Sequence, residues 1–316
     1  MGSEFNLISR DAQRALEEFA QDFTAALTQG PVDQWSKTHG IYKSVGPAVK
    51  LTFPVPVSAA GYKELEGDLK YRDLFQKSLS FTPKTWQDGV SALASVIEAP
   101  DFIGWTAEPA AMAAAAMSLP NEIIAGLLED NPTGWDEKAF FAGDHPVNVF
   151  DDSKGTFDND VTGAGTDPTT ENLALAMQHF DNMKAANGKP MGLRMTHVFH
   201  PPSQRDKWKK ILEQDLLIQT IGDSFGAVDN IYKGVVTPVC CYELSDTSKW
   251  YAAALNKPGL VPWVLADSGA PEEIRHDKDS HLYKTSLKVG LAYVLRGNGA
   301  LALPHCMARW AGTAPA

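Results

Sequence analysis

The sequence is poor in cysteine and poor in positive charge. Its 316 residues include 3 cysteines, and 28 Lys and Arg stand against 39 Asp and Glu, a formal net charge of −11. A chain this acidic lacks the basic face that phosphate binding requires, which argues against nucleic-acid binding as its main task. Cys240, Cys241 and Cys306 form no C-x-x-C motif. We expect them to be buried thiols in a reducing compartment.

Long apolar runs are also missing. No uninterrupted apolar stretch reaches about 18 residues, so the sequence predicts no membrane span, and no signal peptide is visible. The opening residues 1–5, MGSEF, are typical of a cloning scar. With 44% hydrophobic and 21% charged residues the chain can build real cores, and its length predicts one large domain or two of ordinary size.

Motifs for metal binding, phosphate binding and nucleophilic catalysis are absent from the sequence. None of the 8 histidines forms an H-E-x-x-H or H-x-H motif. His197 and His200 lie three residues apart at a strand end, and on a strand this spacing does not bring two side chains together. No G-x-S-x-G nucleophile motif occurs. The Gly-Ala-Gly at 163–165 lacks the features of a phosphate loop. We therefore expect no catalytic residue, no cofactor and no metal.

Residues 151–168 form a polar, glycine-rich segment with one metal-like pattern. Asp158, Asp160, Thr162 and Gly163 stand at positions 1, 3, 5 and 6 of a calcium loop. Position 12 should be a bidentate Glu and is Thr169 instead. The pattern favours a solvated loop over a calcium site.

The segment AFFAGDHPVNVF, residues 139–150, contains the one candidate acid–base pair, Asp144 and His145. Neighbours on an extended chain point to opposite sides, so Asp144 does not automatically orient His145. No nucleophile motif accompanies the pair. A structural turn is the favoured interpretation, and a soluble hydrolytic enzyme using Asp144 and His145 is kept as an alternative.

Two segments at the N-terminal end lack a partner within an obvious single core. Residues 9–28 predict a helix with one apolar stripe of Leu16, Phe19, Phe23 and Leu27. Residues 45–97 predict an extended arm, in which Leu65, Leu69 and Tyr71 alternate with charged residues and Leu79 and Phe81 return. A long two-stranded arm is marginal alone in water. This is typical of an assembly subunit, in which both segments bury against neighbouring copies.

The remaining elements are predicted from periodicity and chain breakers. Residues 102–130 are Ala-rich, and Pro120 is expected to split them into two helices, the second starting at Asn121. The other predictions are a helix over 168–187 opened by Asp167-Pro168 and ended by Gly188, a strand over 193–199, a helix after Ser203, a strand over 283–295, and a turn at 297–299 leading to a return strand.

One block carries a specific resemblance. FIGWTAEPAAMAAAAMSLPNEIIAGLLED, followed by GWDEKAFFAGDHPVN, resembles the major head subunit of Mu-like phages and prophages. Pro120-Asn121-Glu122 and the run from Phe140 to Pro146 match that family, whereas Asp136-Glu137 stands where the family has Asp-Gly. MTHVFHPPSQRDKWKKIL and YKTSLKVGLAYVLRGNGALAL resemble its later segments. The likeness covers about residues 60–310 and is specific over 103–148.

The resemblance implies an α+β chain with the Hong Kong-type capsid fold of tailed phages. The implied division is an N-terminal arm (1–45), an extended β-hairpin loop (46–88), a peripheral domain with a spine helix (89–165), an axial domain (166–282) and C-terminal strands of the peripheral domain (283–316). Asp144-His145-Pro146 would be a turn that links the spine helix to the peripheral sheet.

The implied function is that of a major capsid protein of a tailed phage or prophage. The chain would assemble through its extended loop and N-terminal arm into an icosahedral head that encloses double-stranded DNA without sequence-specific binding. The expected partners are copies of itself in pentamers and hexamers, with scaffold, portal and decoration proteins as candidates. The location would be the virion, after assembly in the bacterial host cytoplasm. An encapsulin-like compartment shell around an enzyme cargo is the alternative with the same fold.

Overall fold

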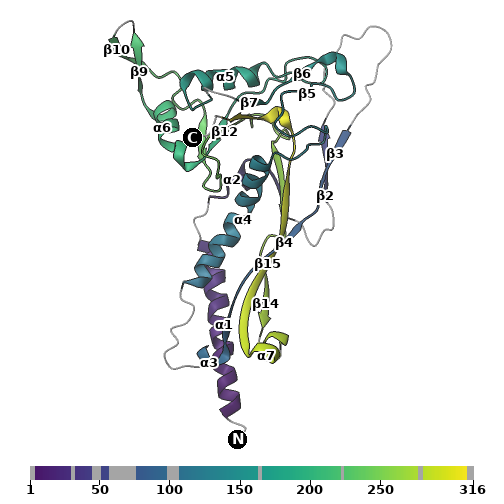
Figure 1. Cartoon of the computed structure of the whole chain (residues 1–316), viewed down its shortest axis with the longest axis vertical. Coiled ribbons are helices and arrows are strands. Elements are labelled where there is room, and N and C mark those ends of the chain that lie inside the picture. Colours follow the sequence, from purple (N-terminus) through teal and green to yellow (C-terminus); the bar gives the residue numbers. More distant parts are fainter. Residues whose placement is uncertain are drawn as a thin grey trace.

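The computed structural model describes residues 4–29, 33–44, 51–56, 76–97, 107–162, 166–221, 224–276 and 280–311. The chain is elongated (Figure 1), with a long helix and a narrow ribbon of strands at one end and a wider part at the other. The mixture of helices and strands is the α+β class that the sequence predicts.

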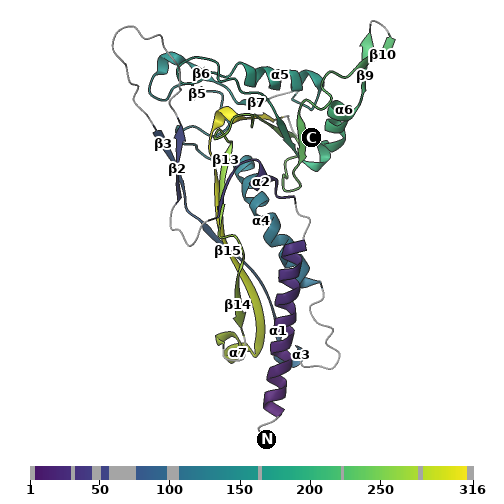
Figure 2. The ribbon, with the colours of Figure 1, turned by 180° about the vertical axis from the view of Figure 1, so that it is seen from behind.

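The two longest helices, α1 (Glu4–Gln29) and α4 (Glu108–Asp130), pack against each other, as both ribbon views show (Figures 1 and 2). The predicted apolar stripe exists, since Leu16, Phe19 and Phe23 are buried. However, it packs on Met112 and Ala113 of α4 and on the strand β15 of the same chain. The expectation that this helix needs a neighbouring copy to cover its stripe is therefore wrong for the single chain. The small side chains of α4 let α1 approach closely.

Helix α4 runs through Pro120 without a break, which corrects the prediction of two helices. Proline removes one backbone N–H and crowds the preceding turn, which normally costs about 3 kcal/mol. The loosened turn gains a partner here, because Gln34 Nε2 donates to the Met117 carbonyl oxygen at 3.1 Å. Pro120 itself is buried. The burial of Pro120 and the added hydrogen bond in the preceding turn are consistent with the continuous helix.

By length and hydropathy α4 is also the one helix in the described part of the chain that could cross a membrane. The helix contacts α1, α2 (Trp35–Thr38), β13 and β15 within the same chain. The core helix of a soluble protein meets the same criterion, and these contacts identify α4 as a core helix.

One sheet is built around a single long strand, β15 (Lys288–Leu301). Near its C-terminal end β15 pairs antiparallel with β13 (Trp263–Asp267), which in turn pairs in parallel with β1 (Ile41–Ser44). Along the rest of its length β15 lies between β4 (Lys84–Leu93) and β14 (Glu272–His276), both antiparallel to it. We call the β4–β15–β14 part the ribbon.

The predicted turn at 297–299 is wrong, because β15 continues straight through Gly297-Asn298-Gly299. These glycines serve close packing instead: a Cβ on Gly299 would lie 2.9 Å from Ile124 Cδ1 of α4 and 3.0 Å from the Val264 carbonyl oxygen. The predicted strand over 283–295 also starts later, because Ser280 caps a short helix, α7 (His281–Ser286), which ends at Leu287 in a left-handed conformation.

The second sheet has the strand order β11-β8-β12-β16-β7. Its strands are β11 (Thr237–Cys240), β8 (His197–His200), β12 (Lys249–Ala253), β16 (Met307–Ala311) and β7 (Asp160–Thr162). The helices α5 (Thr170–Asp181) and α6 (Arg205–Glu213) share a core with it that includes the buried indoles of Trp208, Trp250 and Trp310. A separate hairpin, β9 (Leu216–Ile221) with β10 (Ser224–Asp229), projects from this part (Figure 1).

Several boundaries around the second sheet differ from the predictions. Helix α5 begins after Thr169, whose side chain accepts the Asn172 N–H, and it ends well before Gly188. Ser203 makes no cap for α6. The strand expected over 193–199 forms only from His197 and runs to His200.

The base of the predicted extended loop is a hairpin of β2 (Leu51–Pro56) with β3 (Gln76–Phe81). Leu79 and Phe81 are buried against the first sheet and Leu303, as expected for a returning strand. The predicted charged strand with Leu65, Leu69 and Tyr71 lies outside the described residues.

Short elements complete the fold. They are α3 (Ala94–Ile97), β5 (His145–Pro146), β6 (Thr156–Phe157), and the 3₁₀ turns η1 (Asp152–Lys154), η2 (Pro202–Gln204) and η3 (Pro304–Cys306). A central core joins α2, α4 and residues of both sheets, with Trp35 and Trp263 at its centre.

Candidate functional site

The segment after the spine helix α4 contains two residues with a left-handed backbone, Asn131 and Glu137. Asn131 ends the helix with a left-handed φ of 50°, and its carboxamide accepts from Phe141 N at 2.7 Å and donates to Phe141 O at 3.0 Å. The backbone then turns at 134–137, where Glu137 has a φ of 67°. Left-handed backbone favours glycine, and Glu137 stands where the resembling family has Gly, so the tight turn forms here without one. Phe140 and Phe141 are buried as a result.

The two candidate catalytic residues, Asp144 and His145, point to different places. Asp144 is exposed and pairs with Lys138, and this hydrogen bond holds the pKa of the Asp144 carboxyl below its ordinary value. His145 is fully buried at the start of β5. Its Nδ1 lies 2.6 Å from Asp136 Oδ2, and its Nε2 lies 3.0 Å from the Phe140 carbonyl oxygen.

Both ring nitrogens of His145 are thus occupied by structural partners, and no nitrogen is free to activate a nucleophile. The turn predicted at Asp144-His145-Pro146 lies one residue earlier, at Gly143-Asp144, and His145-Pro146 form β5 instead. It missed Asp136, nine residues upstream, as the true partner of His145. The sequence does show Asp136 shortly before Phe140 and Phe141, and the structure places it in a tight turn.

Asn159 ties this segment to the C-terminal part of the chain. Its Nδ2 donates to the carbonyl oxygens of Phe140, Pro304 and Met307, at 2.9, 3.2 and 3.2 Å, and its Oδ1 accepts from Ala142 N. Asn159 is fully buried. One carboxamide therefore joins the segment after the spine helix to η3 and β16.

The two aspartates of the calcium-like pattern, Asp158 and Asp160, accept hydrogen bonds from other groups of the protein. Arg309 of β16 binds both carboxylate oxygens of Asp160, with Nε–Oδ1 and Nη2–Oδ2 distances of 2.8 and 2.6 Å. Asp158 Oδ1 accepts from the backbone of Asp160. Gly163 lies outside the described residues. Over the described ranges no group of three or more His, Cys, Asp or Glu side chains is arranged to hold a metal ion.

The other histidines and the cysteines have structural surroundings. His197 packs against His39, with ring centroids 4.7 Å apart, whereas His200 faces Trp208. Cys241 and Cys306 are buried, and burial raises the pKa of the Cys306 thiol to about 12. Cys240 is half-buried and accepts a hydrogen bond from Arg205. The expectation of buried thiols thus holds for two of the three cysteines.

Residues 33–44 are held firmly between the spine helix and the sheets, which the sequence did not indicate. The buried Asn121 of α4 accepts from Ser36 N and Ser36 Oγ at 3.1 and 2.8 Å, and it donates to Asp33 O and Glu243 Oε1. Trp263 Nε1 donates to Ser36 O at 2.7 Å. The chain passes so close to Trp263 that a Cβ on Gly40 would overlap the indole.

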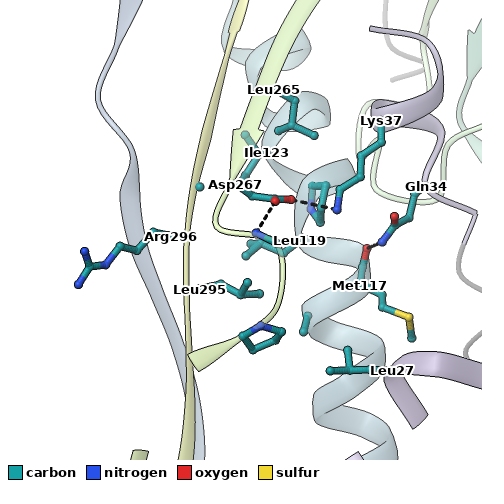
Figure 3. A pocket seen from close by; sticks show the side chains of 15 residues that line it. Leu27, Gln34, Lys37, Met117, Leu119, Ile123, Leu265, Asp267, Leu295 and Arg296 are labelled. Atoms are coloured by element: carbon teal, nitrogen blue, oxygen red, sulfur yellow. Dashed lines mark hydrogen bonds and ion pairs between the residues drawn. The ribbon is translucent and has the colours of Figure 1, made fainter. Parts of the chain in front are cut away.

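We call the contacts of Asn121 with residues 33–36 the clasp. A small cavity of about 70 Å³ lies beside the clasp (Figure 3), between α2, α4 and the first sheet. Asp267 faces it and accepts from Lys37 Nζ at 2.9 Å and Tyr42 Oη at 2.7 Å. Burial, followed by the hydrogen bond to Asp267, raises the pKa of the Tyr42 hydroxyl to about 12. Arg296 lies on the far side of β15 and points away from the cavity. The cavity is too small for an ordinary substrate.

A second, more open groove of about 260 Å³ lies between α4 and the ribbon. Its lining combines α1, α4, β4 and β15 and is largely apolar, with Asp88 and Glu122 as its charged side chains. It carries no acid–base pair or nucleophile arrangement. The features of this chain are therefore those of packing and contact surfaces.

A scan against family models finds one match, to the phage capsid protein family, over residues 77–297. This span covers most of the chain, including the spine helix, the His145 segment and most strands of both sheets, whereas β1 and β16 lie outside it.

The chain belongs to the phage capsid protein family.

This capsid protein is also similar to solved shell structures. It matches a chain of the procapsid of bacteriophage JBD30 with a TM-score of 0.50 and 13% identity, covering 100% of this chain and 77% of that one. It matches the capsid of a native GTA particle with a TM-score of 0.57 and 9% identity, covering 90% and 93%. It matches the capsid of the cyanophage P-SCSP1u with a TM-score of 0.56 and 9% identity, covering 87% of each. A comparison with curated proteins finds no match.

These likenesses confirm the Hong Kong-type capsid fold inferred from the sequence block around the spine helix. Together with the family, they identify the chain as a structural protein, the major capsid protein of a phage head. Neither the encapsulin-like shell nor the hydrolytic enzyme is favoured, since the family is that of phage capsids and His145 is a buried packing residue.

Proposed function

We propose that the capsid protein assembles through contacts at the far end of its ribbon, together with its extended loop. Three apolar side chains gather there: Leu93 at the end of β4, Val96 in α3 and Leu287 before β15, with exposed fractions of 43%, 49% and 61%. The Ala94 N–H donates to the Leu287 carbonyl oxygen, which brings the three segments together. We call these three residues the ribbon tip. An apolar cluster at the end of a projecting element supports a role as a subunit contact.

The extended loop, residues 46–88, is proposed to lie across a neighbouring subunit. Its base is anchored, because Leu79 and Phe81 of β3 are buried in their own chain. An anchored base can transmit load from a contact at the loop to the core of the subunit. Several such contacts per subunit, each weak, would together give a stable shell.

The domain division remains a proposal, with the N-terminal arm at 1–45, the peripheral domain at 89–165 and 283–316, and the axial domain at 166–282. The pairing of β7 and β16 with β8, β11 and β12 favours assigning residues 160–162 and 307–311 to the axial part. The clasp around Asn121 favours treating residues 33–44 as part of the body, with only α1 as an arm.

We further propose that the protein has no catalytic role, that it forms pentamers and hexamers in the host cytoplasm, and that it encloses DNA without reading its sequence. The net charge of −11 supports a shell that does not bind the packaged DNA tightly. Scaffold, portal and decoration proteins remain candidate partners.

Size-exclusion chromatography and negative-stain microscopy of the expressed protein test assembly. Megadalton particles are expected, and a lasting monomer would contradict the proposal.

Replacing both Leu93 and Leu287 of the ribbon tip by Lys should leave a folded subunit by circular dichroism but reduce particle yield at least tenfold. The matched control is Gln178→Lys, an exposed position on α5. Deleting residues 60–75, which leaves β3 and the buried Leu79 in place, should likewise abolish particles and leave a folded monomer; normal shells from this deletion would refute the role of the extended loop.

A further inference from the structure

The buried ring of His145 contacts two groups that accept hydrogen bonds. Nδ1 lies 2.6 Å from Asp136 Oδ2, and Nε2 lies 3.0 Å from the carbonyl oxygen of Phe140. A backbone carbonyl can only accept, and an ionised carboxylate can only accept. Against an ionised Asp136, a neutral imidazole with its single N–H can satisfy one of these two contacts but not both.

The identity of both acceptors is fixed by their other partners. Phe140 O also receives the Asn159 Nδ2–H at 2.9 Å, and the orientation of that carboxamide is set because its Oδ1 accepts from Ala142 N. Asp136 Oδ1 faces the Lys138 N–H at 3.4 Å, so the second carboxylate oxygen also accepts. The side chain of Asp136 is 3% exposed and that of His145 is 0% exposed, so water does not replace these partners.

We propose that His145 is held as an imidazolium ion at neutral pH, paired with the Asp136 carboxylate, and that this buried ion pair latches strand β5 to the turn at 134–137. Each N–H then has one acceptor, and the buried charge is compensated. The latch joins the turn at 134–137, the backbone after α4 and strand β5 at a single ring.

The other ionisable groups around His145 fit this assignment. Asp144 is exposed and taken up by Lys138, so Asp136 is the one carboxylate within hydrogen-bond distance of the His145 ring in the described part of the chain. On the other side, the ring of Phe157 stacks on His145 and also contacts His305 of η3, with centroid distances of 5.1 and 4.3 Å. His179 of α5 lies beyond His305 and faces Asp158.

The two histidines on either side of Phe157 consequently differ in charge. His305 Nδ1 is buried and has no hydrogen-bond partner among the described residues, so a proton added there would lack an acceptor. Burial, and after it the positive charge of His145, lower the pKa of His305 to about 4. The fold thus keeps one cation and one neutral ring in the same cluster. A second proton would place two cations against Phe157 and loosen the latch in acid.

Solid-state NMR of assembled particles labelled with ¹⁵N and ¹³C tests the charge of His145 at pH 7. The ring is assigned in the wild type through its correlation with the preceding Asp144, since Asp144-His145 is the single Asp-His step in the sequence. Both ring nitrogens are expected at the chemical shifts of protonated imidazole. One unprotonated nitrogen in that ring would overturn the proposal.

Two variants separate the partners of His145. Asp136→Asn should convert its ring to the neutral pattern, since a carboxamide does not compensate the charge. Asp144→Asn, the matched control at the sequence neighbour, should leave both nitrogens protonated. If Asp144→Asn neutralises His145 and Asp136→Asn does not, the assignment of the ion pair is wrong. The wild-type spectrum decides the charge state even if Asp136→Asn does not fold.

Discussion

The ring of Phe23 lies parallel to the ring of Tyr293, with their centroids 3.6 Å apart and their planes 12° apart. This stack joins the N-terminal helix α1 to the ribbon strand β15 of the same chain. Burial, followed by the nearby charge of Glu273, raises the pKa of the Tyr293 hydroxyl to about 12, so the ring stays neutral in ordinary buffers.

Replacing Phe23 by Ala should lower the free energy of unfolding of the unassembled subunit by roughly 3–5 kcal/mol, because a buried aromatic ring is lost and a cavity remains. Urea denaturation followed by circular dichroism measures the effect. The exposed neighbour Asp22→Ala is the control. If Phe23→Ala and Asp22→Ala have equal stability, α1 is not part of the folded subunit in solution.

Two glycines beside the spine helix should respond to alanine in opposite ways. A Cβ on Gly299 would lie 2.9 Å from Ile124 Cδ1, so Gly299→Ala is expected to lower the free energy of unfolding by about 1–3 kcal/mol. Gly126 lies within α4 with no atom within 4 Å of an added Cβ, so Gly126→Ala should raise it by roughly 0.5–1 kcal/mol. Thermal denaturation of both variants checks the pair. Equal shifts would contradict the close approach of α4 to β15.

Glu137 has a left-handed backbone that costs a non-glycine residue about 1 kcal/mol. Because its side chain is exposed, Glu137→Gly removes strain without removing packing. The free energy of unfolding should rise by roughly 0.5–1 kcal/mol, measured by urea denaturation. Gln178→Gly, at an exposed helical position, should instead lower it by a similar amount. A loss of stability in Glu137→Gly would show that the turn has another geometry.

The subunit should lose stability as the pH falls from about 6.5 to about 4. Burial holds the pKa of His305 and of His197 at about 4, below the ordinary value of 6.5. In this window the unfolded chain binds protons that the folded chain does not. The free energy of unfolding therefore decreases as the pH decreases. Each group contributes a slope of at most about 1.4 kcal/mol per pH unit.

His305→Asn removes one titrating group and should therefore make this pH dependence shallower. His281→Asn, at an exposed position, should leave the slope unchanged. Urea midpoints measured at intervals of half a pH unit give the comparison. A slope that is identical in wild type and His305→Asn would exclude His305 as a source of acid sensitivity.

The sequence predicted the elements with strong local signals and failed where distant segments decide. The stripe of Leu16, Phe19 and Phe23 is a local pattern, and the structure confirms the helix. The identity of the surface that covers the stripe depends on Ala113 and Leu291, far along the chain, and no periodicity reveals it.

Chain breakers were the other source of error. Pro120 does not end its helix: it is buried in the core, and Gln34 donates to the Met117 carbonyl oxygen in the preceding turn. Gly297 and Gly299 do not turn the strand: Gly297 packs closely against β13, and Gly299 makes room for α4. In the same way, Asp144 adjoins His145 in sequence, but the tight turn at Asp136 brings a different carboxylate to the ring. The residue types identified which positions could break an element or pair with His145. The tertiary contacts determined which of them do so.

The pairing of β1 with β13 and of β7 with β16 has a consequence for synthesis on the ribosome. Each pair joins an early segment of the chain to one made much later, so neither sheet can close until nearly the whole polypeptide has emerged. A nascent or truncated chain would therefore expose its early hydrophobic segments without the partners that cover them. Such a chain depends on chaperones during translation, and only complete subunits would present a finished surface for building a shell.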